Sequence, residues 1–91
     1  MIYRVKLTPT AAKMFTRLHP DIKTQLKSKL KSLQGSPHLG KKLQNELANL
    51  RSLKMKRYRI IYQIAAAPKA VIVYAIGQRR DIYEIIAELI P

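Results

Sequence analysis

The sequence predicts a small α+β domain with a mainly antiparallel sheet, in the element order β-α-α-β-β-β-α. The chain has 91 residues, which is enough for one modest hydrophobic core and too few for two. Apolar residues recur with a helical period in the first part of the chain and mostly alternate along strands in the second. We therefore expect residues 1–91 to form a single domain, with a helical hairpin on one face of the sheet.

One strand and a first helix are expected at the start of the chain. Residues 2–7 alternate between apolar and basic side chains, as a half-buried strand does. Thr8 suits an N-cap and Pro9 the first helical position, so a helix should run from there to about residue 18. The buried face of this helix is predicted to consist of Ala12, Phe15 and Leu18.

A second helix is expected between Pro20 and the Gly-Ser-Pro sequence at residues 35–37. Its apolar residues recur at spacings of four, four and three, and lysines occupy the other faces. The apolar stripe consists of Ile22, Leu26, Leu30 and Leu33. Residues 38–50 show no clear period and are interpreted as a connection with room for a short turn of helix.

Three strands and a last helix follow this connection. Residues 50–56 and 57–65 are expected to be strands joined around Lys56 and Arg57. Residues 66–69 form a predicted hairpin turn into a third strand at residues 70–76. The last helix is expected at about residues 82–90.

The charge of the chain is strongly positive. Lys and Arg number 18 against 5 Asp and Glu, which gives a formal net charge of +13. Such a surface attracts nucleic acid, an acidic membrane or an acidic protein, and charge alone does not choose among these. No apolar run is long enough to span a bilayer, and the N-terminus lacks the features of a signal peptide, so we expect a cytoplasmic protein.

Several kinds of site are disfavoured by the residue types present. The chain has no cysteine, which removes disulfides and thiolate chemistry, and its three glycines are too far apart for a phosphate-binding loop. His19 and His38 lack a local set of carboxylates, so we expect no metal and no cofactor.

A cationic surface is predicted on the sheet face that the helical hairpin leaves uncovered. Alternation places Arg59 on this face of its strand, and it places Lys54 and Lys56 together on one side of the preceding strand. Arg79 follows the neighbouring strand and would come close to the same place, with Tyr83 at the rim.

Such a surface suits RNA cleavage. The 2′-hydroxyl attacks the adjacent phosphate, the phosphorane gathers negative charge, and fixed Arg and Lys donors stabilise that charge. A tyrosine, or a lysine whose pKa nearby cations lower, can take and give the proton. The simpler interpretation is that Arg79 and Arg80 are a surface pair after a strand and that Asp81 caps the last helix.

Two segments of the sequence resemble a known family. The segments "GKKLQNEL…LRSLKMKRYRIIYQI" and "VIVYAIGQRRDIY" resemble the RelE branch of the RelE/ParE superfamily of toxin–antitoxin toxins. The most specific pieces are "YRIIY" at residues 58–62 and "IGQRRDIY" at residues 76–83, in this order and separated by a hairpin. The resemblance covers essentially the full chain.

The resemblance implies a cytoplasmic toxin with a small, microbial-RNase-like fold that cuts mRNA in the ribosomal A site. It also implies a RelB-like antitoxin, acidic or amphipathic, that neutralises the toxin in a hetero-oligomer. By the same resemblance, Arg59 and Arg79 hold the scissile phosphate, Tyr83 stacks on a base or assists proton transfer, and Lys54 supports proton transfer or charge. The residues expected to bind RNA are Arg51, Lys56, Arg57 and Arg80.

The sequence also departs from the best-studied members, which carry two lysines at alternating positions of the second strand. The register here gives either Ser52 and Lys54 or, with a shifted hairpin, Lys54 and Lys56. The segment from Gly77 to Tyr83 is shorter than in some members. A ParE-like inhibitor of DNA gyrase, or an inactive binding protein on the same fold, is the alternative function.

Overall fold

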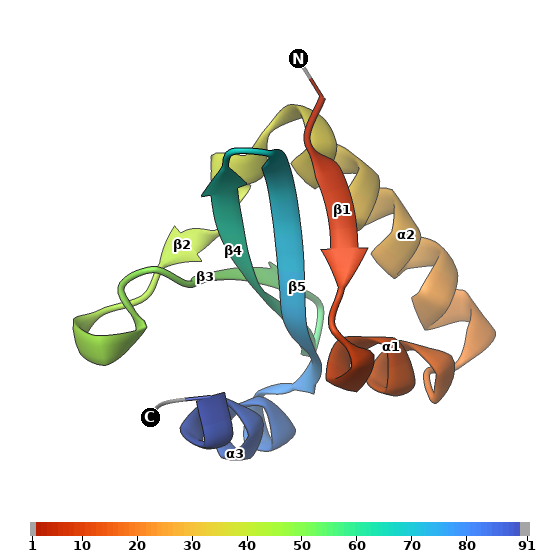
Figure 1. The fold of residues 1–91 in the computed structure, drawn as a ribbon. Coiled ribbons are helices and arrows are strands. Elements are labelled where there is room, and N and C mark those ends of the chain that lie inside the picture. The colour runs from red at the N-terminus through yellow and green to blue at the C-terminus, as the bar shows by residue number, and fades with distance from the viewer. Residues whose placement is uncertain (1, 90–91) are drawn as a thin grey trace.

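Five strands form one mixed sheet in the computed structural model, which describes residues 2–89 (Figure 1). The strand order is β1-β5-β4-β3-β2, and only the β1–β5 pair is parallel. The predicted α+β class with a mainly antiparallel sheet is confirmed. The strands are β1 (Arg4–Leu7), β2 (Lys41–Lys42), β3 (Arg51–Met55), β4 (Tyr58–Ala66) and β5 (Lys69–Gln78).

Helices cover both faces of the sheet. On one face α1 (Pro9–Thr16) and α2 (Pro20–Gly35) pack on a core that contains Leu26, Ile60 and Val73. This is the predicted helical hairpin, and the leucine stripe of α2 lies in the core as expected. The last helix, α3 (Arg79–Leu89), packs on the opposite face, where Ile82 and Ile86 join a second cluster with Ile61, Ala75 and Leu50.

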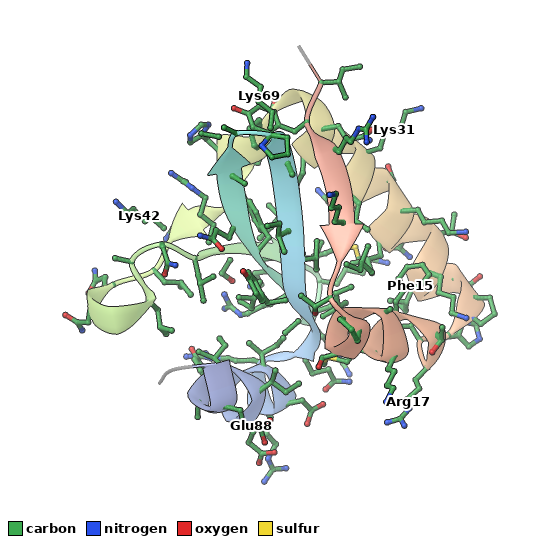
Figure 2. All side chains as sticks on the ribbon, in the orientation of Figure 1. Phe15, Arg17, Lys31, Lys42, Lys69 and Glu88 are labelled. Atoms are coloured by element: carbon green, nitrogen blue, oxygen red, sulfur yellow. The ribbon has the colours of Figure 1, made fainter. Side chains whose placement is uncertain are left out.

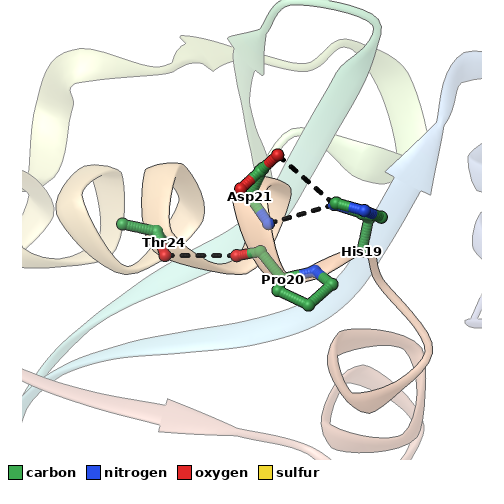
Figure 3. A network of polar contacts seen from close by, with 4 residues as sticks. All are labelled: His19, Pro20, Asp21 and Thr24. Carbon is green, nitrogen blue, oxygen red and sulfur yellow. Dashed lines mark hydrogen bonds and ion pairs between the residues drawn. The ribbon is translucent and has the colours of Figure 1, made fainter.

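Side-chain caps fix the starts of α1 and α2. The Thr8 hydroxyl accepts a hydrogen bond from the amide of Ala11 at 3.2 Å, as the sequence predicts for an N-cap. At the start of α2, His19 Nδ1 accepts from the amide of Asp21 at 3.2 Å, and the Thr24 hydroxyl donates to the Pro20 carbonyl (Figure 3). His19 Nδ1 also lies 3.7 Å from a carboxylate oxygen of Asp21.

The prediction for the buried face of α1 is confirmed at Phe15 and Leu18, which pack against the core, and was wrong at Ala12. Ala11 is fully buried and Ala12 is exposed. Residues 11, 14, 15 and 18 follow the full i, i+3, i+4, i+7 spacing of a helical stripe, and this sets the rotation of the helix. The helix also ends at Thr16, two residues before its expected end.

The connection between α2 and β3 contains more structure than the sequence indicates. It holds two short 3₁₀ helices, η1 (Pro37–Leu39) and η2 (Asn45–Leu47), with the edge strand β2 between them. The strand was missed because two adjacent lysines show no alternation. Its position depends instead on pairing with β3, where Lys41 lies opposite Ser52 and Lys42 opposite Arg51.

The buried hydroxyl of Tyr62 anchors the start of this connection. Tyr62 Oη accepts from the amide of Gly40 at 2.9 Å and donates to the carbonyl of Pro37 at 2.7 Å. Burial raises the pKa of Tyr62, although the Gly40 hydrogen bond and the charge of Arg51 act in the other direction. The hydroxyl therefore keeps its proton at neutral pH and can act as donor and acceptor at once.

The last helix begins three residues earlier than expected. Arg79 and Arg80 form its first turn together with Asp81, rather than a loop before it. An acidic residue in the first turn is favourable next to the helix N-terminus, which supports the structural interpretation of Asp81. The expected end of this helix at residue 90 lies outside the described residues.

Candidate functional site

Arg59 lies near the start of β4, on the sheet face opposite α1 and α2. It lies opposite Lys54 on β3 and opposite Gly77 on β5. The side chain is half-buried, and its Nη1 lies 3.5 Å from the hydroxyl of Ser52, a weak hydrogen bond. Ser52 is itself buried, so this contact limits the orientations of the guanidinium.

A cationic cavity of about 670 Å³ lies on one side of Arg59. Its walls come from β2, β3 and β4 and from the chain around β2, and none of the side chains described there is acidic. Lys42 extends outward from β2 at this edge of the molecule (Figure 2). The cations that line the cavity are Lys41, Lys42, Lys54 and Arg59.

A smaller cavity of about 70 Å³ lies on the other side of Arg59. Ser52 and Arg59 line both cavities, and Tyr83 of α3 joins them in this one. The remaining wall is apolar, because Ile61, Ile82 and other core residues form it. Arg59 therefore connects a wide cationic cavity to a narrow one that has a phenol at its rim.

Arg79 reaches this site through Tyr83. Its guanidinium carbon lies 5.8 Å from the centroid of the Tyr83 ring, within the range of a cation–π contact. Tyr83 is 57% exposed, so part of its side chain is accessible to a ligand. Three of the four predicted catalytic residues thus line the adjoining cavities: Lys54, Arg59 and Tyr83. Arg79 lines neither cavity and is linked to them through its contact with the Tyr83 ring.

The register of the β3–β4 hairpin decides between the two lysine arrangements left open by the sequence. Met55 pairs with Tyr58, which makes Lys56 and Arg57 the two residues of the turn. Lys56 has a φ of 56°, a left-handed conformation outside the strand. Ser52 and Lys54 are therefore the alternating pair on the Arg59 face.

The residues expected to bind RNA lie in three different places. Lys56 and Arg57 are exposed at the hairpin turn, and Arg80 is exposed in the first turn of α3. Arg51 does not line either cavity, and its Nη1 donates to the carbonyl of Gly40 at 2.9 Å. Arg51 thus holds the start of β2, and its placement favours a structural role.

Lys41 and Lys42 were not among the predicted site residues. Their adjacency to Gly40 is visible in the sequence, but only the Tyr62 and Arg51 contacts to residues 37–40 place them beside Arg59. Ser52 was noted only as a register alternative, and its contact with Arg59 depends on cross-strand geometry.

Among the side chains that the structure describes, no three His, Asp or Glu residues are grouped so that they could hold a metal ion. None of the helices described is long and apolar enough to cross a membrane.

The fold is that of RelE-like toxins. The toxin chain of the RelBE2 toxin–antitoxin complex from Mycobacterium tuberculosis matches with a TM-score of 0.81 and 28% identity, over 87% of this chain and 100% of that one. The isolated Escherichia coli RelE toxin matches with a TM-score of 0.75 and 25% identity, over 98% and 99% of the two chains. A putative RelE-like toxin protein from Escherichia coli is 27% identical over 97% of both sequences.

The family model described as the ParE toxin of the type II toxin–antitoxin system parDE matches residues 5–83. The chain belongs to this family, within the RelE/ParE superfamily of toxins.

Proposed function

We propose that this toxin is a metal-independent mRNA endonuclease that works in the ribosomal A site. The observation that carries the proposal is the arrangement around Arg59, where Lys54 and Tyr83 line the two cavities that Arg59 shares, and Arg79 contacts the Tyr83 ring. An inhibitor that acts only by binding a protein does not require this combination of side chains.

The geometry suits cleavage by transesterification. The 2′-hydroxyl attacks the adjacent phosphorus, the bond from phosphorus to the 5′-oxygen breaks, and a 2′,3′-cyclic phosphate forms. Arg59 is half-buried and held by Ser52, so its fork can stabilise the phosphorane with little reorganisation. Arg79 adds a second cation.

Proton transfer is assigned to groups beside Arg59. Lys54 lies directly opposite Arg59 across the β3–β4 ladder and lines the same cavity. In the proposal the attacking 2′-hydroxyl gives its proton to water, and the ammonium of Lys54 stabilises charge and supplies the proton to the leaving 5′-oxygen. Tyr83 stacks on a neighbouring base with the ring face that Arg79 leaves free.

We also propose a RelB-like antitoxin as the partner, in a hetero-oligomer formed in the cytoplasm. The solved relative from Mycobacterium tuberculosis is a toxin–antitoxin complex, and the net charge of +13 here favours an acidic or amphipathic partner. In the described part of the chain, no acidic side chain forms an ion pair with Lys54 or Arg59. In the proposal, acidic side chains of the antitoxin bind these two cations and the hydroxyl of Tyr83.

A two-arm experiment tests the proposed function. The toxin is induced in growing cells, and the ends of translated mRNAs are mapped by sequencing, while purified toxin is added to a DNA gyrase supercoiling reaction. We expect new mRNA ends within codons and unchanged supercoiling. Gyrase inhibition without new mRNA ends would establish the alternative, which the ParE description of the matching family favours.

Substitution of Ser52 by alanine is expected to lower the cleavage rate about 2- to 10-fold, because one hydrogen bond of roughly 0.5–1.5 kcal/mol would be lost. The contact orients the guanidinium of Arg59, so the loss should appear in kcat more than in KM. Single-turnover cleavage with Ser52→Ala and Ser52→Thr measures this. Ser52→Thr retains the hydroxyl. If it lowered the cleavage rate as much as Ser52→Ala, the proposal that the Ser52 hydroxyl orients Arg59 would be wrong.

A further inference from the structure

An open pocket of about 400 Å³ lies beside α3, away from the Arg59 cavities. It is formed where the end of α1, the start of β4, the end of β5 and the first turns of α3 meet. Asp81 and Ile85 of α3 line it, whereas Ile82, Tyr83 and Ile86 line the Arg59 side. The proposed cleavage chemistry uses none of the residues of this pocket.

The walls of the pocket are apolar and the rim is polar. Met14, Leu18, Ile76 and Ile85 supply apolar surface, and Tyr58 adds an aromatic ring. Gly77 also lines it, and a Cβ there would come 3.0 Å from Met14 Cε, so the glycine allows Met14 its close approach. The volume lies within the range of roughly 300–1,000 Å³ that is usual for small-molecule sites.

Three polar side chains with different hydrogen-bonding capacity reach the rim: Arg17, Gln78 and Asp81. Arg17 extends from the end of α1, at the end of the molecule where α3 lies (Figure 2). The guanidinium only donates, the carboxylate only accepts, and the amide does both. Asp81 is one of only five acidic residues in the chain, so an acceptor at this rim is a specific feature of a cationic surface.

Arg17 is the cation that lines the pocket, and three further cations follow or precede lining residues in the sequence. Tyr58 lines the pocket, and the exposed hairpin turn immediately before it carries Lys56 and Arg57. Gln78 lines the pocket as well, and Arg79 directly follows it. Arg79 also contacts the ring of Tyr83, and Tyr83 lines the smaller cavity beside Arg59. The chain from Gln78 to Tyr83 therefore links this pocket to the Arg59 site.

We propose that this pocket binds a nucleobase of the RNA substrate next to the cleaved phosphate, and that it selects bases with an exocyclic amino group. The apolar walls and the Tyr58 ring pack against a planar base, and the nearby cations bind the phosphates of the same nucleotide. Asp81 accepts a hydrogen bond from the amino group, which adenine, cytosine and guanine carry and uracil lacks. The inference rests on the proposed RNase function.

Base preference at the cut sites tests the inference. Libraries of RNA cut by the wild type, by Asp81→Asn and by Asp21→Asn are sequenced at their new ends. Asp21 is the matched control, since it is also an exposed acid in the first turn of a helix and lies outside the pocket. We expect the wild type and Asp21→Asn to disfavour uracil at one fixed position beside the cut.

Asp81→Asn is expected to reduce this discrimination about tenfold, the size of one specific base contact. The same base preferences in Asp81→Asn and the wild type would overturn the inference and leave the proposed cleavage intact. Unchanged preferences together with weaker antitoxin binding would show that the pocket binds protein instead.

A binding measurement separates this inference from the proposed function. The methyl signals of Met14 and Ile85 are followed by NMR while each of the four nucleoside 5′-monophosphates is added to the full-length protein. We expect both signals to shift with the adenine, cytosine and guanine nucleotides and less with the uracil nucleotide, and Arg17→Gln to weaken the shifts. Shifts in a protein that cuts no RNA would support the pocket and refute the nuclease, whereas no shift in a protein that does cut would refute the pocket.

Discussion

Substitution of Arg59 by alanine is expected to reduce RNA cleavage by at least about 10²-fold, the usual cost of removing one fixed donor from a developing oxyanion. Arg59 lines both cavities of the site and lies directly opposite Lys54, so no neighbouring cation occupies the same position. The measurement is single-turnover cleavage of a translated mRNA, with circular dichroism as a check on folding.

Two further variants separate charge from geometry at this position. Arg59→Lys keeps the charge and loses the planar fork, and we expect it to recover only part of the rate. Lys29→Ala, on the exposed side of α2, removes the same amount of charge far from the site and serves as the control. Equal losses in Arg59→Ala and Lys29→Ala would mean that the general cationic field, not Arg59 itself, drives activity.

Substitution of Gly40 by alanine should have the largest effect on stability. An added Cβ would lie 2.7 Å from Tyr62 Oη and 3.0 Å from the backbone carbon of Ser52. Tyr62 is fully buried and cannot move aside freely, so overpacking should cost about 1–3 kcal/mol in the free energy of unfolding. Urea denaturation measures this cost.

Gly35→Ala provides the matched control, because nothing lies within 4 Å of an added Cβ at that position. Its backbone is helical, so alanine should leave stability unchanged or raise it by about 0.5–1 kcal/mol. Tyr62→Phe supplies a second test, since it leaves the Gly40 amide and the Pro37 carbonyl without this partner, at a cost of about 1–3 kcal/mol.

In the Tyr62→Phe background, Gly40→Ala should cost less than in the wild type, because its nearest clash has been removed. Strictly additive effects would show that the hydroxyl of Tyr62 does not anchor residue 40.

The parts of the fold that follow from local pattern could be predicted from the sequence. Alternation along residues 58–64 separated the core side chains from Arg59, and the leucine spacing of residues 26–33 defined the buried side of α2. The strand β2 could not be predicted, because its position depends on a hydrogen bond between residues 22 positions apart. The first turn of α3 was missed because three consecutive charged residues show no apolar period.

In the candidate site, too, some residues could be predicted from local sequence pattern, whereas others depend on contacts between distant parts of the chain. Arg59 and Lys54 follow from strand alternation, while the expectation for Tyr83 came mainly from the "IGQRRDIY" resemblance. Its ring could be placed beside Arg79 and the Arg59 cavity only by the packing of α3 on the sheet. Lys41, Lys42 and Ser52 depend on contacts between β2, β3 and β4 that no local pattern encodes.

The parallel pairing of β1 with β5 also constrains when the protein becomes active during its synthesis. Residues 4–7 pair with residues 70–73, and β5 separates β1 from β4 in the sheet. A growing chain without residues 69–78 therefore has no partner for β1 and no strand to join β1 to β4. Arg59 and Tyr83, which line one cavity, come together only after residues 79–83 have been made, so a shorter chain carries no assembled site.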